Sequence, residues 1–279
     1  MYEEYWGLKE KPFDNTPDPR FLYHSQQHNE ALARMLYVVR ERKGAAIFTG
    51  EYGSGKTLLS RVLWHELQQE NKYQAVFILN PRLSGLELIQ EIVYQLNSNE
   101  IPTNRLDLFH SLHNILYTNY QQARHCVIVV DEAQAIGNRE IFEELRLLLN
   151  FQLDNVFLLT IILLGQPELK DIIVNLPQLN QRMAMRFHLK ALNEIETKEY
   201  ILHRLRVAEA KREIFQEDCF GQIYHFSRGV PRLINTICDL ALLTGFGNGL
   251  KFIDRDTILK VNEDLSSAGG LQDLGPLPK

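Results

Sequence analysis

Residues 50–57 read GEYGSGKT and match the pattern GxxxxGK[ST] of loops that hold phosphate groups. The glycines let the backbone turn tightly so that N–H groups face phosphate oxygens, and a following helix adds its positive N-terminal end. We expect Lys56 to contact the β- and γ-phosphates and Thr57 to offer its hydroxyl to Mg²⁺. A glycine-rich turn that binds nothing is the alternative, but lysine and threonine in this register add no packing advantage. The predicted contacts are Gly50, Glu51, Tyr52, Gly53, Ser54, Gly55, Lys56, Thr57 and Leu58.

Two adjacent carboxylates, Asp131 and Glu132, follow the apolar run 126–130. Ligands of open α/β sheets bind where parallel strands end, so we expect both acids at the ligand-binding edge. Asp131 is suited to hold Mg²⁺ through its water shell, and Glu132 to polarise the water that attacks the γ-phosphorus. An acidic helix start is the alternative, since carboxylates favour a helix N-terminus. The phosphate-loop pattern in the same chain favours the functional interpretation.

The elements that must position these residues follow from hydrophobic periodicity. Short apolar, β-branched runs predict buried strands at 45–49, 75–79, 126–130 and 156–164. Apolar residues at three- and four-residue spacing predict helices at 57–70, 85–96, 106–122 and 139–151. Alternating strands and helices imply a parallel sheet, and the predicted fold class is therefore α/β, a three-layer αβα arrangement.

The pattern changes after Leu192, where the strands stop. Helical stretches at 195–210, 216–227 and 232–245 predict a compact C-terminal helical lid domain. We therefore divide the chain into an N-terminal segment, an α/β nucleotide-binding domain, a helical lid domain and a tail that we expect to be disordered. Their respective bounds are 1–30, 31–190, 191–265 and 266–279.

Bulk composition excludes several classes of protein. Among the 279 residues, 45% are hydrophobic and 23% charged, which is an ordinary globular balance. The formal net charge of −5 gives no overall reason to expect nucleic acid, although a local basic patch could exist. The cysteines lack any CxxC spacing, so we expect no disulfide framework or zinc site and a reducing, cytoplasmic setting. No secretory signal is predicted, and the apolar run 156–164 is too short for a transmembrane segment.

Several motifs together resemble AAA+ P-loop ATPases, and more closely the ExeA/GspA type linked to bacterial secretion and MshM-like pilus biogenesis. The motifs are YWGL with PF (5–8, 12–13), PDPRFLY (17–23), the phosphate loop, DEAQ (131–134), LGQPEL (164–169) and GVPRLIN (229–235). The resemblance extends over nearly the whole chain. It implies that ATP lies in a cleft between the α/β domain and the helical lid, and that neighbouring subunits of a homo-oligomer complete each site.

The resemblance also assigns roles to four residues outside the two motifs. Gln166 matches the polar sensor of the γ-phosphate, where an amide can orient the attacking water. The segment 181–187 matches the position of an arginine finger that acts on the adjacent protomer, with Arg182 favoured over Arg186. Arg232 matches a second sensor arginine on the lid. The alternatives are a loop glutamine, solvated or ion-paired arginines, and a first-turn helix residue.

Two further groups carry weaker signals. The histidine pairs have helical spacings that could ligate metal, but no third ligand completes a site, and surface or packing roles are favoured: His24 with His28, and His110 with His113. N-terminal aromatic residues could line an adenine pocket or anchor the segment to the core, and the sequence leaves both open: Trp6, Phe13, Phe21 and Tyr23.

The favoured function is a cytoplasmic ATPase that hydrolyses ATP with Mg²⁺ in a homo-oligomeric ring, with a hexamer as the expected form. The ring would drive assembly of an envelope system: type II secretion, a type IV pilus or polysaccharide export. Longer relatives continue into a membrane helix and a peptidoglycan-binding module, so we expect this chain to reach the inner membrane through a partner protein. The first alternative is a TnsC-like, ATP-dependent DNA-binding regulator of transposition, which would need a basic surface. The second is a scaffold that binds ATP without hydrolysis, against which Glu132 argues.

Overall fold

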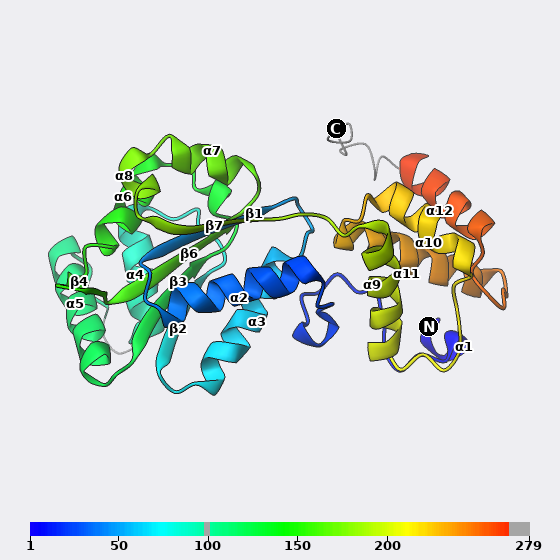
Figure 1. Cartoon of the computed structure of the whole chain (residues 1–279), viewed down its shortest axis with the longest axis horizontal. Coiled ribbons are helices and arrows are strands. Elements are labelled where there is room, and N and C mark those ends of the chain that lie inside the picture. Colours follow the sequence, from blue (N-terminus) through cyan, green and yellow to red (C-terminus); the bar gives the residue numbers. More distant parts are fainter. Residues whose placement is uncertain (98–100, 268–279) are drawn as a thin grey trace. The chain divides into compact units, whose positions relative to one another are not determined.

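A computed structural model describes residues 1–97 and 101–267 of the chain. It divides into two compact units, coloured along the sequence in Figure 1. The α/β unit contains Gln26–Tyr52 and Lys56–Lys190. The helical unit contains Met1–Ser25, Gly53–Gly55 and the described chain from Ala191 onward. The N-terminal segment, set apart in the sequence analysis as residues 1–30, is not a separate body, because it joins the helical unit up to Ser25 and then enters a helix of the α/β unit.

The α/β unit is built on a parallel sheet in the order β2-β3-β6-β1-β7. The strands are β1 (Ala45–Gly50), β2 (Tyr73–Ile78), β3 (His125–Val130), β6 (Leu159–Gly165) and β7 (Met183–Leu189). Every neighbouring pair is parallel. The three central strands β3, β6 and β1 are buried along their whole length, which explains their apolar, β-branched composition. The predicted α/β class with a parallel sheet is confirmed.

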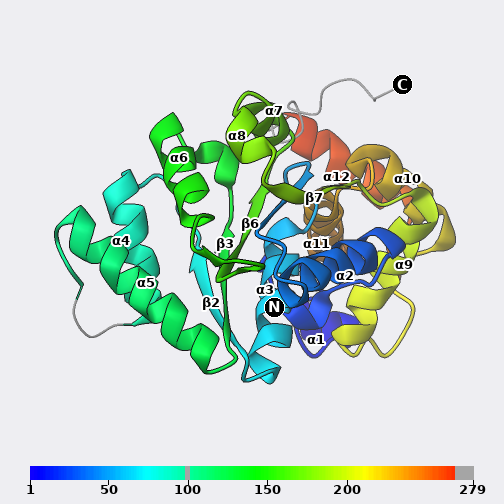
Figure 2. The same ribbon diagram turned by 60° about the vertical axis from the view of Figure 1, so that its left-hand side comes forward.

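Helices cover both faces of this sheet, as Figure 2 shows. The layer of α2 (Gln26–Arg40) and α3 (Lys56–Gln69) packs on one face. The opposite layer contains α4 (Gly85–Leu96), α5 (Arg105–Gln121) and α6 (Arg139–Leu148), followed by the shorter α7 (Glu168–Val174) and α8 (Pro177–Asn180). Alternate strand residues such as Ile128 and Val130 join the core cluster beneath the second layer. The three layers thus arise from period-two burial in the strands and amphipathic helices on each side.

Two predicted features of the α/β unit are wrong, and one strand was missed. The strand expected at 156–164 starts only at Leu159, because Val156–Phe157 (β5) pairs with Gln152–Leu153 (β4) in a small antiparallel hairpin. Leu79, placed in a strand by the sequence, lies beyond β2 and is 61% exposed. Strand β7 was missed because it is an edge strand whose outward positions hold polar side chains, including Arg186 and His188.

The helical unit contains α9 (Glu194–Val207), α10 (Glu217–Ser227) and α11 (Pro231–Gly247), near the predicted positions. It also contains α12 (Arg255–Ser267), which the sequence analysis missed because this stretch is mostly polar and buries only a few side chains. Ser266 and Ser267, assigned to a disordered tail, belong to α12. The rest of the predicted tail, residues 268–279, lies outside the described residues.

The N-terminal segment supplies part of the core of the helical unit. It begins with α1 (Glu3–Trp6) and continues through the short 3-10 helix η1 (Pro19–Phe21). Trp6 and Phe13 are 0% and 1% exposed, and the Trp6 indole N–H donates to the Leu242 carbonyl at 2.9 Å. The buried Arg204 guanidinium of α9 lies over the Phe21 ring, 4.7 Å from its centroid. These aromatic side chains therefore anchor the segment to the helical unit.

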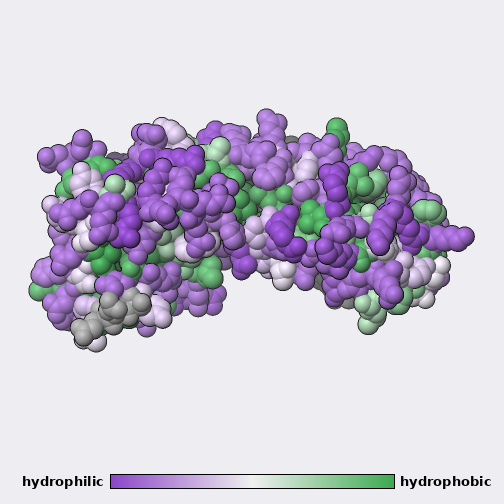
Figure 3. Space-filling view, turned by 90° about the horizontal axis from the view of Figure 1, so that it is seen from below, coloured by the Kyte–Doolittle hydropathy of each residue, from purple (hydrophilic) through white to green (hydrophobic). Residues whose placement is uncertain are grey.

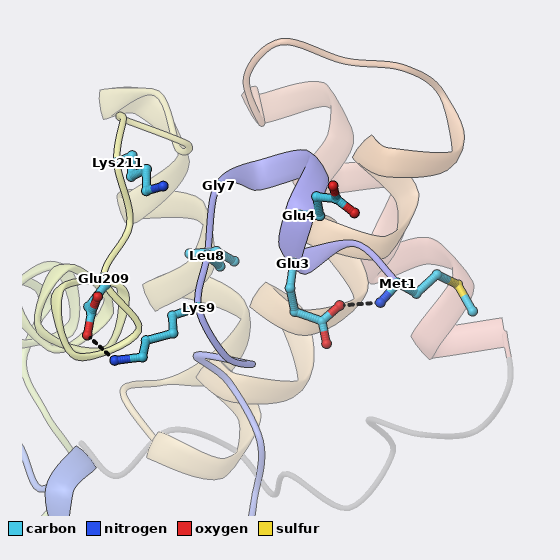
Figure 4. Close-up of a pocket in the computed structure, with 8 residues that line it drawn as sticks. All are labelled: Met1, Glu3, Glu4, Gly7, Leu8, Lys9, Glu209 and Lys211. Atoms are coloured by element: carbon cyan, nitrogen blue, oxygen red, sulfur yellow. Dashed lines mark hydrogen bonds and ion pairs between the residues drawn. The ribbon is translucent and has the colours of Figure 1, made fainter.

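A surface cavity lies away from the predicted site. A cavity of about 580 Å³ borders the N-terminal segment and the stretch after α9, with Lys9 and Glu209 paired across it at 2.7 Å (Figure 4). None of its lining residues belongs to the predicted site. On the face drawn in Figure 3, hydrophilic residues predominate and apolar residues form small separate groups. Over residues 1–97 and 101–267, no helix has both the length and the apolar character that crossing a bilayer requires.

Candidate functional site

The phosphate-loop pattern connects the carboxyl end of β1 directly to the first turn of α3. Gly53 and Gly55 have φ angles of 80° and 102°, in the region that favours glycine. The Lys56 side chain is 6% exposed, and its ammonium donates to the carbonyls of Gly50 at 2.7 Å and Glu51 at 2.9 Å. Burial lowers the pKa of Lys56, an effect that the nearby carboxylates of Glu132 and Asp131 oppose. The loop thus holds a cationic amine at the sheet edge by its own carbonyls.

Asp131 follows the last residue of β3 and meets the start of α3. The Thr57 hydroxyl donates to Asp131 Oδ2 at 2.7 Å, and the Glu132 backbone N–H donates to Oδ1 at 2.9 Å. Asp131 is 3% exposed, and this burial raises the pKa of its carboxyl, while the hydrogen bond from Thr57 lowers it. The two predicted metal ligands therefore lie side by side although they are 74 residues apart in sequence.

This pair fits Mg²⁺, which prefers oxygen ligands and usually takes one or two carboxylates together with water and substrate phosphates. A buried carboxylate that receives only neutral hydrogen bonds from Thr57 and the backbone is electrostatically suited to a cation. Within the described parts of the chain, no group of three or more His, Cys, Asp or Glu residues is placed to hold a metal.

Glu132 and Gln166 are brought close by the adjacency of β3 and β6. Glu132 adopts a left-handed conformation with φ 50° and ψ 38°. The side-chain amide of Gln134 donates to the Glu132 carboxylate, while its carbonyl oxygen accepts a hydrogen bond from the Gln166 backbone N–H at 2.9 Å. Sequence reasoning gave Gln134 no role. Its place in the DEAQ motif was the available signal, but the link to Gln166 depends on the order of the strands.

Arg182 and Arg186 lie elsewhere in the α/β unit. Arg182 directly precedes β7, whose first residue, Met183, pairs with Ala45 at the start of β1. The phosphate loop follows the opposite end of β1, about 17 Å away at the usual strand rise. The Arg182 guanidinium donates to the Asn150 side chain at 3.2 Å.

Arg186 is further along β7, opposite Ile47 of β1. Its guanidinium donates to the backbone and side-chain oxygens of Asn180, both at 2.7 Å. Arg186 is therefore tied to the end of α8 on its own chain. Neither arginine is brought to the Lys56–Asp131 region of the same chain.

Arg232 belongs to the helical unit, where it is an exposed residue in the first turn of α11. Its backbone N–H donates to the carbonyl of Gly53, which belongs to the same compact unit, at 3.3 Å. A Cβ atom at Gly53 would lie 2.5 Å from Arg232 Cβ, so the close approach requires glycine.

Comparisons with known proteins identify the fold of this chain. Residues 39–173 match a family model described as an AAA domain. The solved structures of Aeropyrum pernix ORC2 protein and Pyrobaculum aerophilum Cdc6p have TM-scores of 0.70 and 0.69 at 17% and 16% identity. The alignments cover 92% and 94% of this chain and 72% and 74% of those chains. The RuvB branch migration motor of Thermotoga maritima has a TM-score of 0.60 at 20% identity, over 89% of this chain and 72% of that one. The chain therefore has the fold of P-loop ATPases with an AAA domain.

A relative narrows this class further. The chain is 37% identical to General secretion pathway protein A of Aeromonas hydrophila over 280 aligned positions, which cover 99% of this chain and 50% of that protein. This chain is thus a homologue of General secretion pathway protein A, as the sequence motifs predicted, and it spans about half the length of that relative.

Proposed function

We propose that this protein is a Mg²⁺-dependent ATP hydrolase that works as a homo-oligomer in the assembly of a bacterial envelope system. The hydrogen bond between Thr57 and Asp131 carries the proposal, because it joins the phosphate loop to the acid pair at one edge of the sheet. AAA-domain proteins are generally ATP hydrolases, and the ORC2 structure is described as a complex with ADPNP and ADP.

Each residue of this edge has a distinct task in the proposed reaction. Lys56 binds the β- and γ-phosphates once they replace the loop carbonyls as its partners. Thr57 and Asp131 hold Mg²⁺, which neutralises phosphate charge when bound. Glu132 accepts hydrogen bonds from the attacking water and orients it, and the amide of Gln166 stabilises charge near the γ-phosphate. The remaining predicted loop contacts and Arg232 of the lid complete nucleotide binding.

The position of Arg182 supports the proposed homo-oligomer. It is separated from the phosphate loop of its own chain by the length of β1, so it cannot act there within the α/β unit. An arginine that stabilises transition-state charge can instead be supplied by a neighbouring protomer. We therefore assign Arg182 to the site of the next subunit, in a ring for which a hexamer is the expected form, and keep Arg186 as the second candidate.

The envelope role rests on homology with General secretion pathway protein A. We place the protein in the cytoplasm, recruited to the inner membrane face by a partner of a secretion, pilus or polysaccharide-export system. The buried free thiols of Cys126, Cys219 and Cys238 are compatible with a reducing compartment. A TnsC-like role in transposition would require binding to polyanionic DNA, which the formal net charge of −5 does not favour.

Phosphate release from ATP by the purified protein tests the enzymatic part of the proposal. We expect turnover that requires Mg²⁺ and a larger particle mass by light scattering when ATP is present. A folded protein that shows saturable nucleotide binding but no Mg²⁺-dependent phosphate release would contradict it. Salt-sensitive binding to duplex DNA in the presence of ATP, without affinity for envelope proteins, would select the transposition alternative.

A further inference from the structure

The half-buried side chain of Gln134 bridges two parts of the candidate site. Its amide nitrogen donates to the Glu132 carboxylate, and its carbonyl oxygen accepts the hydrogen bond of the Gln166 backbone N–H at 2.9 Å. Glu132 follows β3, and Gln166 follows the neighbouring strand β6. One carboxamide therefore connects the expected base with the loop that carries the expected γ-phosphate sensor.

The residues around the Gln134 carboxamide leave space for it and support its hydrogen bonds. A Cβ atom at Gly165 would lie 2.6 Å from Gln134 Oε1 and 2.7 Å from a methyl carbon of Leu169, so only glycine leaves room for the link. The left-handed backbone of Glu132 is unfavourable for a residue with a side chain. Two hydrogen bonds stabilise Glu132 in this conformation. Its backbone N–H donates to the Asp131 carboxylate, and its own carboxylate accepts from the Gln134 amide.

We propose that Gln134 is a positioning residue that fixes the Glu132 carboxylate relative to the end of β6, so that base and sensor keep one geometry during turnover. This inference rests on the proposed ATPase function. The hydrogen bond occupies Oε2 of Glu132 and restrains the rotamer of a side chain whose backbone is already unusual. The other oxygen is directed by that restraint and serves as the acceptor for the attacking water. Misplacement of such a group by about 1 Å can cost on the order of 100-fold in rate.

Two substitutions separate the two arms of the bridge. Gln134→Met keeps the length of the side chain but removes both hydrogen bonds. Gln134→Glu keeps an acceptor for the Gln166 N–H, loses the donor to Glu132 and places two carboxylates side by side. We expect kcat to fall by roughly 10- to 100-fold in Gln134→Met and at least as far in Gln134→Glu, with KM for ATP within about twofold of the wild type. Gln68→Met, at an exposed position of α3, is the matched control and should match the wild type.

A double-mutant cycle distinguishes positioning from a merely structural role. If Gln134 acts through Glu132, adding Gln134→Met to Glu132→Gln should not slow single-turnover hydrolysis further. An equal additional loss in that background would overturn the inference, as would a Gln134→Met variant that turns over at the wild-type rate. A parallel rise in KM and in the nucleotide dissociation constant would also overturn it, because it would indicate general damage to the site. Wild-type protein without ATP hydrolysis would instead refute the proposed function itself.

Discussion

A polar side chain is buried at each end of strand β3, but the two side chains have different surroundings. His125, the first residue of β3, is 2% exposed and pairs through Nε2 with the Thr160 hydroxyl at 2.8 Å. Burial lowers its pKa to about 3, so the imidazole stays neutral. Asp131, just past the other end, is 3% exposed, and burial raises the pKa of its carboxyl. Lys56 and Thr57 nevertheless converge on it.

We infer that the edge of the sheet where the strands begin (the amino edge) contributes to packing, and that the edge where they end (the carboxyl edge) contributes to function. At the edge of the sheet where the strands begin, His125 and Thr160 pair with each other as neutral groups, while His125 Nδ1 is buried without a hydrogen-bond partner. At the carboxyl edge a buried carboxylate lies beside a buried amine that is held by loop carbonyls, an arrangement that a metal–phosphate complex would complete. Stability and activity should therefore respond oppositely at the two edges, and the substitutions below test this from the largest expected effect to the smallest.

Arg182 is an exception to this division between packing and function. It lies at the amino edge, but we assign it to the active site of a neighbouring chain. Arg182→Ala should lower kcat by about 10³-fold while leaving nucleotide affinity unchanged, since an arginine finger acts on transition-state charge. Steady-state hydrolysis and equilibrium nucleotide binding measure the two quantities.

Mixed oligomers and a second variant control this result. Arg182→Ala subunits mixed with Glu132→Gln subunits should regain activity, because some interfaces then combine an intact arginine with an intact base. A mixture without recovery would assign Arg182 to its own chain. Arg186→Ala should retain most of the activity, since that guanidinium is tied to Asn180. If Arg186→Ala lost most of its activity while Arg182→Ala kept normal activity, Arg186 would be the arginine finger in place of Arg182.

Glu132→Gln tests whether the carboxyl edge of the sheet takes part in catalysis. Loss of a group that polarises water typically slows a reaction by about 10²- to 10⁴-fold, and we expect kcat to fall within that range with ATP still bound. Radiolabelled ATP retained by the variant on size-exclusion chromatography checks both parts. Equal loss of binding and turnover would show that Glu132 holds the nucleotide and is not a base.

The sequence predicted where the phosphate loop and the acid pair lie relative to the strands more accurately than it predicted several of the surrounding helices and strands. The phosphate loop and Asp131–Glu132 follow buried strands, so local motif and local structure coincide. Strand β7 escaped prediction because Arg186 and His188 occupy outward positions of an edge strand, and α12 because it is mostly polar. The role of Gln134 depends on β6 lying between β3 and β1, which no local pattern encodes.

His125→Leu probes the amino edge, where only stability should change. The substitution removes the hydrogen bond to Thr160 and leaves its hydroxyl buried without that partner, at a cost of about 1–3 kcal/mol in the free energy of unfolding. Thermal unfolding should show a lower Tm, while kcat and KM at a permissive temperature stay near wild type. Loss of activity in a folded His125→Leu protein would contradict the assignment of this edge to packing.

The pH dependence of stability gives the same histidine a second test. Below the ordinary histidine pKa of 6.5 the unfolded chain takes up a proton at His125, whereas the folded chain resists it down to about pH 3. His125 therefore contributes to the fall in stability as pH drops through this window. Denaturant titrations of His125→Leu should show a shallower fall, and an identical slope would indicate that His125 titrates normally in the folded protein.

Among these substitutions, Asp131→Asn should have the smallest effect on stability. It should raise the free energy of unfolding, whereas His125→Leu should lower it. Because burial raises the pKa of Asp131, its ionised form disfavours the fold at pH 7, and asparagine removes that charge. We expect a higher Tm in the nucleotide-free variant, together with loss of Mg²⁺-dependent turnover. A lower Tm in the nucleotide-free variant would mean that Asp131 is mainly structural.

Calorimetric titration of a non-hydrolysable ATP analogue, with Mg²⁺ or with a chelator, tests the central claim most directly. We predict saturable binding to each chain that is weakened by removal of Mg²⁺ and by at least about tenfold in Lys56→Ala, and unchanged in Lys43→Ala, an exposed lysine before β1. A protein shown to be folded by circular dichroism that takes up no nucleotide, or that binds it equally well after Lys56→Ala, would contradict the account.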